Sequence, residues 1–338
     1  MTSDVIFVVL EFEDGLPSEN SLELISAAMA ARKGDPEVLA VCLGFEITDS
    51  ALSELAARGA NKVVVVDDQV LDPYLAEPWV KELTALAGEY GPSHILFPHS
   101  AFGMDCAPRL AFRLETAVVT GCVGIEDVDG ITHWTRSCYG GNAGEIVTLL
   151  TSPNIATVVP RSFEPLALEA KNKASVDKRS SIVKGSELRT RVLARPERRK
   201  LGVRLETANI VVSGGRGLGG PEQFDQLAEL ADLLGGAPGA SRVACDLGWC
   251  PSSWQVGLSG KTVAPQLYLA MGISGAVQHM SGCGNSKMIV AINNDPEAEI
   301  FKSAGLGIVA DCTEILPALI EEIKRIRGIV RLNSLEVH

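Results

Sequence analysis

Short, uninterrupted apolar runs alternate along this chain with longer stretches of helical periodicity. Six runs rich in β-branched or aliphatic residues occupy residues 5–10, 38–43, 62–66, 94–97, 146–150 and 156–159. Stretches with helix-period apolar residues lie between several of them, at residues 22–31, 51–58, 74–90 and 105–114. A strand that is apolar on both faces must be covered on both faces. The alternation therefore predicts a mainly parallel sheet between two layers of helices.

The strands expected between residues 130 and 159 follow one another without a clear intervening helix, so we expect them to form an antiparallel extension. A second alternating block begins near residue 209. Its expected strands are residues 209–212, 242–244, 288–292 and 307–310, and its expected helices are residues 222–234, 263–271, 300–304 and 313–326. The predicted fold class is therefore α/β, with two doubly wound domains, the first Rossmann-like and the second smaller.

A strongly basic segment separates the two blocks. Residues 178–204 hold ten basic side chains, whereas residues 177–204 hold three acidic ones, in a chain whose formal net charge is −12. We interpret this segment as a solvated connector and hinge between a first domain of residues 1–197 and a second domain of residues 198–338. The open alternative is a surface for an acidic partner.

The composition argues against several classes of protein. The chain has 338 residues, of which 46% are hydrophobic and 21% charged, so it can bury a large core and is not disordered. Its negative charge argues against binding to nucleic acid or to an anionic membrane surface. No apolar run reaches the roughly 18 residues of a membrane span. The N-terminus lacks the basic start and the cleavage site of a signal peptide, so we expect a cytoplasmic protein.

The cysteines and histidines show no metal-binding pattern. None of the eight cysteines forms a Cys-x-x-Cys pair, which argues against zinc ribbons, thioredoxin-like sites and ferredoxin-type clusters. Most of these thiols stand in apolar segments, where we expect them to be buried and reduced. The five histidines lack paired metal-ligand spacing, so we expect no metal site.

A glycine-rich loop follows the strand expected at residues 209–212. Gly215, Gly217 and Gly220 fit the Gly-x-Gly-x-x-Gly pattern, in which glycines let the backbone approach a pyrophosphate at a helix N-terminus. Arg216 within the loop favours a phosphate ligand. The acidic residue that completes such a nucleotide site would be Asp246, which comes late. A purely structural glycine turn fits the loop equally well.

Polar residues after later turns add to this loop. Arg242 would be a costly lone charge inside a buried strand, so we expect it to face a cleft at the sheet edge. Ser259 and Ser274 lack the closing glycine of a nucleophile elbow, which leaves a serine hydrolase unsupported. Gln278 and His279 follow a Ser-Gly turn, where they can hydrogen-bond the edge of a flat heterocycle.

Residues 267–293 resemble the signature of the electron-transfer flavoprotein alpha subunit. The resemblance covers residues 208–326 and includes, in order, Ser-Gly-Gly-Arg-Gly-Leu, Gly-Ala-Ser-Arg, Gln-Val-Gly-x-Ser-Gly-Lys and Ala-Ile-Asn-x-Asp-Pro-Glu-Ala. In the N-terminal half it is limited to the general organisation and to short phrases such as residues 105–109 and 157–163. Separated motifs that occur in the same order are highly specific for a family.

This resemblance implies an N-terminal α/β domain that contacts a smaller beta subunit and a C-terminal domain that binds FAD. The expected heterodimer carries electrons singly between an acyl-CoA dehydrogenase-type flavoenzyme and a redox partner, without converting a substrate itself. Membership of an electron-bifurcating complex, with a second FAD rather than AMP in the beta subunit, stays open. The implied FAD contacts are Arg216, Ser241, Arg242, Gln255, Val256, Gly257, Leu258, Ser259, Ser274, Gly275, Ala276, Val277, Gln278, His279, Asn293, Asp311 and Cys312.

The resemblance also implies roles for individual residues. Arg216 and Ser241 would lie near the phosphates, and Arg242 against the isoalloxazine ring. Ser259 matches a threonine that donates to the flavin N5, and His279 matches a histidine at the flavin O2. A guanidinium and a histidine donor there would stabilise the negative charge that one-electron reduction places over N1 and C2=O.

At position 258 this chain has a leucine where the family usually has a glutamine, so a polar contact near the flavin is lost. The serine at position 259 keeps the hydroxyl but has a looser rotamer than the family's threonine.

Two other functions remain open at this point. The first is a nicotinamide-dependent dehydrogenase built on the Gly-x-Gly-x-x-Gly loop, although the late Asp246 and the lack of a catalytic donor pair count against it. The second is a scaffold subunit that has lost its flavin site, which the retained Arg216, Arg242 and His279 argue against.

Overall fold

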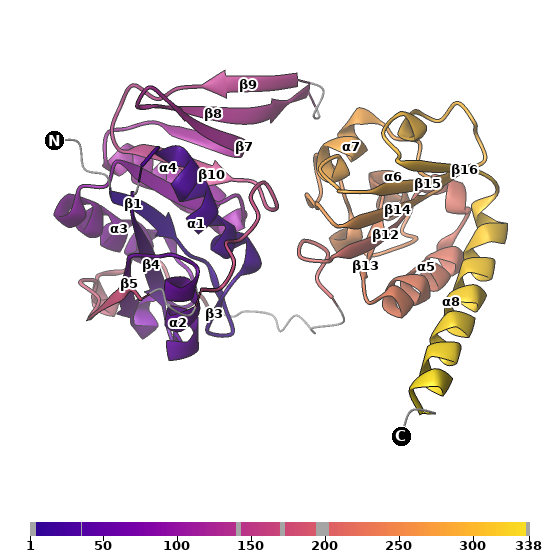
Figure 1. Ribbon diagram of the computed structural model, residues 1–338, viewed down its shortest axis with the longest axis horizontal. Helices are drawn as coiled ribbons and strands as arrows, with labels where there is room; N and C mark the ends of the chain where they lie inside the picture. The colour runs from indigo at the N-terminus through magenta and orange to yellow at the C-terminus, as the bar shows by residue number, and fades with distance from the viewer. Residues whose placement is uncertain (1–4, 35, 140–142, 170–172, 194–202, 336–338) are drawn as a thin grey trace. The chain divides into compact units, whose positions relative to one another are not determined.

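The chain folds into two units, each built around a single main sheet of largely parallel strands (Figure 1). This computed structural model describes residues 5–34, 36–139, 143–169, 173–193 and 203–335. One unit comprises residues 1–137 and 144–197, and the other comprises residues 138–143 and 198–338. The domain boundary expected after residue 197 lies outside the described residues.

The sheet of the first unit has nine strands in the order β11-β5-β4-β1-β6-β10-β7-β8-β9. All neighbours from β11 to β7 pair in parallel, whereas β7 and β8 are antiparallel. The strand bounds are β1 (Val5–Val9), β4 (Glu37–Gly44), β5 (Lys62–Asp67), β6 (His94–Pro98), β7 (Val118–Val128), β8 (Ile131–Cys138), β9 (Ala143–Val147), β10 (Asn154–Val158) and β11 (Ser175–Arg179). A small hairpin of β2 (Phe12–Glu13) and β3 (Leu16–Pro17) is separate.

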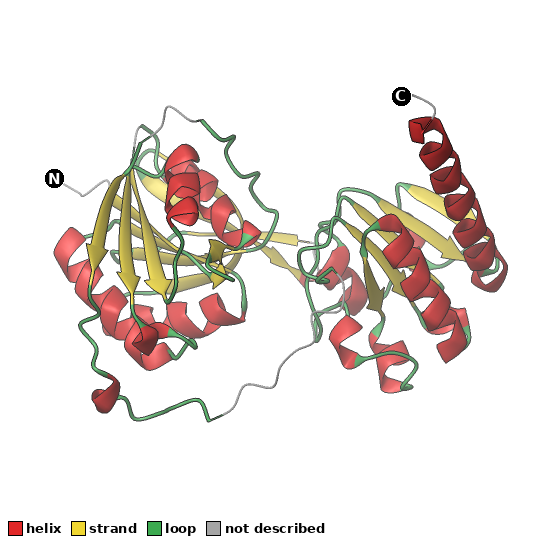
Figure 2. Ribbon diagram, turned by 90° about the horizontal axis from the view of Figure 1, so that it is seen from below, coloured by secondary structure: helices red, strands yellow, loops and turns green. Residues whose placement is uncertain are grey.

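Helices cover both faces of this sheet (Figure 2). They are α1 (Glu19–Ala31), α2 (Asp49–Ala57), α3 (Ala76–Tyr90) and α4 (Ala101–Arg113), with short 3-10 turns η1 (Gln69–Leu71) and η3 (Gly185–Glu187). Successive side chains of a strand point to opposite faces. Ile6 therefore packs with α1 and α2, whereas Phe7 packs with α3 and α4. Both are fully buried, which confirms the predicted strand with two apolar faces.

The expected antiparallel extension is correct only in part. Strand β8 pairs antiparallel with β7, but β10 lies between β6 and β7 and is parallel to both. Ile155 and Ala156 of β10 are fully buried, as a central strand of a parallel sheet requires. The strand expected at residues 146–150 ends at Val147.

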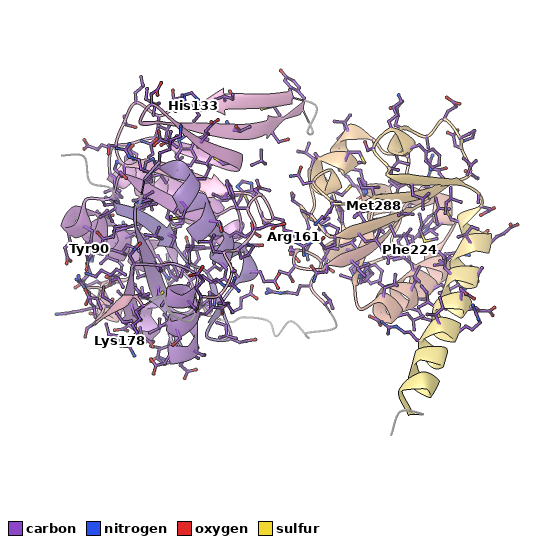
Figure 3. The ribbon with its side chains drawn as sticks, in the orientation of Figure 1. Tyr90, His133, Arg161, Lys178, Phe224 and Met288 are labelled. Atoms are coloured by element: carbon purple, nitrogen blue, oxygen red, sulfur yellow. The ribbon has the colours of Figure 1, made fainter. Side chains whose placement is uncertain are left out.

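The basic segment after residue 177 begins inside the first unit, contrary to the prediction of a solvated connector. Strand β11 pairs in parallel with β5 at the edge of the sheet. Lys178 of β11, labelled in Figure 3, forms an ion pair with Asp49 at 2.9 Å. Further along, Arg189 pairs with Glu77 at 3.1 Å. The acidic partners of Lys178 and Arg189 therefore lie in the same unit.

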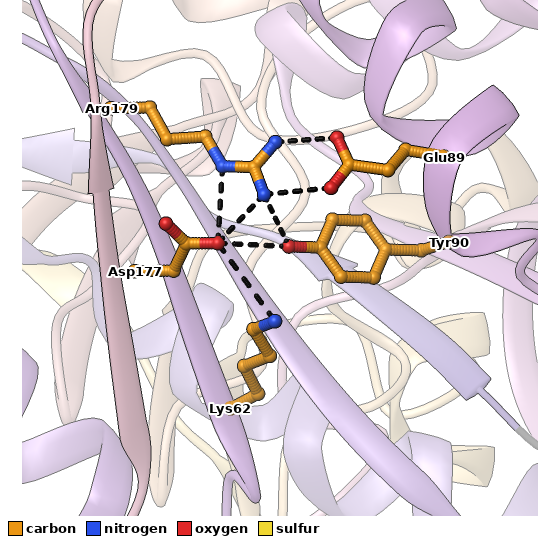
Figure 4. A network of polar contacts seen from close by, with 5 residues as sticks. All are labelled: Lys62, Glu89, Tyr90, Asp177 and Arg179. Atoms are coloured by element: carbon orange, nitrogen blue, oxygen red, sulfur yellow. Dashed lines mark hydrogen bonds and ion pairs between the residues drawn. The ribbon is translucent and has the colours of Figure 1, made fainter.

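Arg179 makes the densest of these contacts (Figure 4). Its guanidinium binds both carboxylate oxygens of Glu89, at 2.5 and 2.7 Å, and also donates to Asp177 and to the hydroxyl of Tyr90. Lys62 lies 3.8 Å from the Asp177 carboxylate. A planar guanidinium held in this bidentate way keeps its geometry better than a lone surface ion pair. It fixes the edge strand to the end of α3.

The second unit has five parallel strands in the order β13-β12-β14-β15-β16. Their bounds are β12 (Ile210–Gly214), β13 (Ala237–Ala240), β14 (Leu267–Met271), β15 (Ile289–Asn293) and β16 (Leu306–Val309). The helical elements are η4 (Arg216–Leu218), α5 (Pro221–Leu234), α6 (Arg242–Asp246), η5 (Ser252–Trp254), α7 (Val277–Cys283), η6 (Glu299–Lys302) and α8 (Cys312–Leu335). Phe224 on α5, labelled in Figure 3, is buried in one core, while Tyr268 belongs to the second core of this unit.

Two predictions for the second unit are wrong. Residues 263–271 were expected to form a helix, but they contain strand β14. A short apolar run that is buried on both faces shows no periodicity, so its sequence does not distinguish a strand from a helix. The expected strand at residues 242–244 is helix α6, which Ser241 caps by accepting a hydrogen bond from the Ala244 amide. The other expected elements of this unit are confirmed, with shifted ends and a 3-10 turn at η6. Within the described ranges, no helix is long and apolar enough to cross a membrane.

Glu23 is one of several carboxyl groups buried in the first unit. Glu23 on α1 is 4% exposed, and its Oε2 accepts a hydrogen bond of 2.7 Å from the Arg161 amide. Arg161 has a φ of +62°, an uncommon backbone conformation that this bond helps to hold. Burial raises the pKa of Glu23 to about 7, although hydrogen bonds from the backbone of Arg161 and Phe163 oppose the shift.

This pKa predicts a pH-dependent stability. The folded chain keeps the Glu23 proton up to about pH 7, whereas the unfolded chain releases it near pH 4.5, so stability falls as the pH rises between these values. The loss amounts to at most about 3 kcal/mol. Glu23→Gln should abolish this part of the dependence in chemical denaturation between pH 5 and 8, and Glu37→Gln, on an exposed side chain, should not. An unchanged profile in Glu23→Gln would contradict the prediction.

Candidate functional site

The carboxyl ends of the second sheet's parallel strands gather the residues predicted for the site. The order of the strands reverses between β12 and β14, and at such a switch point open α/β sheets bind ligands in the crevice beyond the strands. Arg216 follows β12, Ser241 follows β13, and residues 274–279 follow β14. Asn293 ends β15, and Asp311 follows β16.

The glycine-rich loop is used for contact with a neighbouring loop. The Gly215 amide donates to the Met271 carbonyl at 2.8 Å, and the Gly217 amide donates to the Gly272 carbonyl at 3.0 Å. A Cβ atom on Gly215 would lie 2.2 Å from the Gly272 oxygen. The structural interpretation of these two glycines is therefore correct, since their amides are already bonded and cannot cradle a pyrophosphate.

Asp246 does not provide the acidic residue that a nicotinamide dinucleotide site requires. Asp246 does not end a strand but lies in helix α6, where its carboxylate is 3.3 Å from the Arg242 Nε. Both side chains are mostly exposed. An acidic group that binds a ribose must stand at the end of the second strand. The position there belongs to Ser241.

Two arginines are exposed at this edge. Arg216 forms the first residue of η4 and makes no ion pair with any described residue. Arg242 opens α6, so the predicted cost of a lone charge inside a buried strand does not arise. Ser241 is held by its amide, which donates to the Gly214 carbonyl at 2.9 Å. These groups leave two guanidinium ions at the strand ends, available to an anionic ligand.

The loop at residues 255–261 is tied to this edge through its backbone. The Val256 amide donates to the Ala240 carbonyl at 2.9 Å, and the Leu258 amide donates to the Gln278 carbonyl at 2.7 Å. Gly257 adopts a φ of +135°, which an L side chain rarely adopts, and a Cβ there would lie 2.7 Å from the Gln278 oxygen. The loop is thereby fixed against both β13 and α7.

Ser259 and Leu258 present opposite chemistry at the tip of this loop. The Ser259 hydroxyl accepts a hydrogen bond of 2.9 Å from the side-chain Nε2 of Gln255. Its own proton remains free to donate to a ligand. Leu258 is 75% exposed, an unusual position for a large aliphatic side chain.

His279 is the buried polar group of the site. The residue is 7% exposed, and a hydrogen bond of 2.8 Å joins its Nε2 to the Tyr268 hydroxyl. Its Nδ1 has almost no exposed surface and no hydrogen bond of good geometry within the described ranges, although the Val256 backbone interacts with the ring. Burial lowers the pKa of His279 to about 4, and the backbone of Val256 only partly opposes this shift. The ring is therefore neutral near pH 7, and its hydrogen bond with Tyr268 fixes its orientation.

The other residues after β14 shape the backbone. The Ser274 carbonyl accepts from the Ile300 amide at 3.1 Å. Gly275 has a φ of +85°, and a Cβ there would lie 2.2 Å from the Ile300 nitrogen. Ala276, Val277 and Gln278 are exposed at the start of α7.

The remaining three predicted residues already have partners inside the chain. The Asn293 side chain donates to the Ile273 carbonyl and accepts from the Asp295 amide. Asp311 caps α8 through Thr313, whose hydroxyl and amide hydrogen bonds lower the pKa of Asp311. The Cys312 thiol, buried, donates to the Ile292 carbonyl at 3.2 Å. These side chains can hold the strand ends in place. A ligand would use the hydrogen-bonding groups that these contacts leave free.

Tyr268 was missed by sequence reasoning. It lies in the run 267–271 that periodicity predicted as a helix, and only the strand places it opposite His279. The sequence gives one signal for this contact: the hydroxyl of a tyrosine in an apolar run needs a hydrogen-bond partner when it is buried.

Comparison with known proteins relates this chain to flavin-binding families. The electron transfer flavoprotein domain family matches residues 6–182, and the electron transfer flavoprotein FAD-binding domain family matches residues 204–284. The electron transfer flavoprotein subunit alpha of Thermoanaerobacterium thermosaccharolyticum is 40% identical over 326 residues, which cover 95% of this chain and 98% of that protein. The proteins of the same name from Bacillus subtilis and Paracoccus denitrificans are each 39% identical, over 95% and 86% of this chain and 98% and 92% of their own lengths.

The loop contact predicts a contrast between two glycines of one motif. Gly215 has a φ of −108°, which alanine tolerates, so Gly215→Ala should act through its clash with Gly272 alone. We expect it to destabilise the second unit by about 1–3 kcal/mol, as overpacking does. In Gly220→Ala the nearest atom is the flexible Gln223 side chain at 3.3 Å, so this variant should unfold close to the wild-type temperature. Equal losses in the two variants, measured by calorimetry, would contradict the assignment.

Proposed function

Because this chain belongs to the electron transfer flavoprotein alpha-subunit family, we propose that it carries electrons singly between an acyl-CoA dehydrogenase-type flavoenzyme and a redox partner. The family pairs each alpha subunit with a smaller beta subunit, and FAD is the cofactor. The proposed heterodimer uses the first unit to contact that subunit. The observation that carries the proposal is the match of residues 204–284 to a FAD-binding domain family, in a unit whose strand-end loops hold the exposed Arg216 and the Ser259 hydroxyl.

The charged residues at the strand ends fit the phosphates of FAD. Arg216 is an exposed cation without an ion-pair partner among the described residues, on the loop after β12. Ser241 stands at the adjacent strand end with its side chain in the cap of α6. A guanidinium binds phosphate oxygens through paired N–H groups, which favours Arg216 as the main phosphate contact.

Three side chains fit the flavin ring. Bound FAD would supply redox chemistry in one-electron steps. The neutral His279, which Tyr268 orients through Nε2, would lie against a ring oxygen. Ser259 can donate its hydroxyl proton to a ring nitrogen, because its oxygen already accepts from Gln255. Arg242 can turn its guanidinium towards the ring, since its contact with Asp246 is a surface ion pair.

The nicotinamide-dependent alternative is not favoured by any contact in this chain. Gly215 and Gly217 use their amides within the chain, and Asp246 is paired with Arg242. The choice between a bifurcating and a non-bifurcating complex depends on the beta subunit. The exposed Leu258 favours a specialised system.

The function is tested by purifying the chain together with a beta subunit of roughly 250–300 residues, the length of one large α/β domain. We expect a heterodimer whose flavin is bleached when an acyl-CoA dehydrogenase and its substrate are added. Flavin content distinguishes one FAD per heterodimer from two. A flavin-loaded monomer that accepts electrons without a second chain would contradict the heterodimer, and a complex without flavin would contradict the function.

Arg242→Ala tests the assignment at the ring. A charge-assisted contact contributes on the order of 1.5–3 kcal/mol. We therefore expect the potential of the first one-electron step to fall by about 60–130 mV. The measurement is a spectroelectrochemical titration at matched FAD occupancy. Arg325→Ala removes a comparable surface ion pair on α8 and should leave both potentials unchanged. Unchanged potentials in Arg242→Ala would place Arg242 away from the flavin.

A further inference from the structure

Two thiols of the second unit face each other near the predicted flavin site. The Sγ atoms of Cys245 and Cys250 are 3.7 Å apart. The sequence pattern predicts Cys245 to be a buried thiol in a strand, but it lies in helix α6 and both thiols are only partly buried. Five other cysteines, Cys42, Cys106, Cys122, Cys283 and Cys312, are buried. This pair is therefore accessible in a way that those thiols are not.

The turn between the two cysteines brings them together. Helix α6 ends with Gly248 in a left-handed conformation, φ +73°, and the Gly248 amide donates to the Cys245 carbonyl at 2.9 Å. The Trp249 amide then donates to the Ala244 carbonyl at 3.1 Å. This helix-terminating turn folds Cys250 back over the end of α6. A disulfide requires the two sulfur atoms to move from 3.7 Å to roughly 2.05 Å apart.

We propose that Cys245 and Cys250 form a reversible disulfide, with a small-molecule disulfide as the oxidant. One protein thiolate attacks the external disulfide, which breaks that S–S bond and releases one small thiol. The second protein thiolate then attacks the mixed disulfide and releases the other small thiol. Two protein S–H bonds and one external S–S bond are thus exchanged for one protein S–S bond and two external S–H bonds, and two electrons pass to the oxidant.

The surroundings of the pair make this exchange slow at neutral pH. Burial raises the pKa of Cys245, although the Cys250 thiol opposes that shift, and burial raises the pKa of Cys250 to about 12. Only the thiolate is nucleophilic, so the rate should rise as the pH increases. The pair suits a response to sustained oxidation more than rapid turnover.

The bond would join two segments that carry predicted flavin contacts. Cys245 lies on α6, three residues after Arg242, and Cys250 leads through η5 to Gln255 and Ser259. Oxidation would fix the end of α6 to the chain that enters the 255–259 loop. The effect on flavin rests on the function proposed above, whereas formation of the disulfide does not.

The test treats the purified chain, with its co-purified partner, with oxidised glutathione and then alkylates the remaining thiols. Trypsin cuts after Arg242 and Lys261, so one peptide contains both cysteines and no other. We expect this peptide to lose both alkylation sites and two hydrogen atoms, faster at pH 8.5 than at pH 7. Dithiothreitol should reverse the change.

Three variants separate the possible results. Cys245→Ser and Cys250→Ser should each keep a mixed disulfide with glutathione, whereas Cys138→Ser, at the end of β8, should oxidise like the wild type. Two alkylated thiols, or a stable mixed disulfide, in the wild-type peptide would overturn the proposal. A change in the FAD dissociation rate on oxidation, absent in Cys250→Ser, would establish the link to the flavin, and an unchanged rate would refute that link. A disulfide in a chain that binds no FAD would refute only the proposed function.

Discussion

The parallel pairing of β12 with β13 and β14 is the constraint on which the second unit depends. Together with the parallel pairing of β15 and β16, it brings the strand ends that carry predicted contacts to one edge of the sheet. The hydrogen bonds from Gly215 and Gly217 to the loop after β14 continue this pairing beyond the strands. Backbone hydrogen bonds between these two segments therefore form the floor of the switch point. A ligand must lie above that contact, against side chains such as His279 and the 255–259 loop.

The first unit shows how charge is balanced locally. The segment that begins with Asp177 is strongly basic, yet Lys178, Arg179 and Arg189 each have an acidic partner in the same unit. A run of like charges in a sequence can thus belong to an edge strand whose neighbours carry the opposite charge. Because those neighbours are distant in sequence, the pairing is invisible until the strand order is known.

Much of the architecture was predictable, and the failures have physical causes. The continuous apolar runs specified β1, β4, β5 and β6, because strands buried on both faces leave a clear pattern. Run 267–271 has the same pattern but was assigned to a helix, since five residues carry no decisive period. The edge that holds the site was predictable from the loops after the strands. The bonded glycine amides and the partnership of Tyr268 with His279 were not, because they depend on contacts between distant segments.

The burial of His279 also determines how the site responds to acidity. With its pKa near 4, this ring keeps one charge state across the pH range in which most histidines titrate. It acts as a fixed dipole oriented by Tyr268 rather than as a proton acceptor. The field that this side chain contributes is therefore constant when the surrounding medium acidifies. A carrier built this way exchanges electrons without this group also taking up or releasing protons.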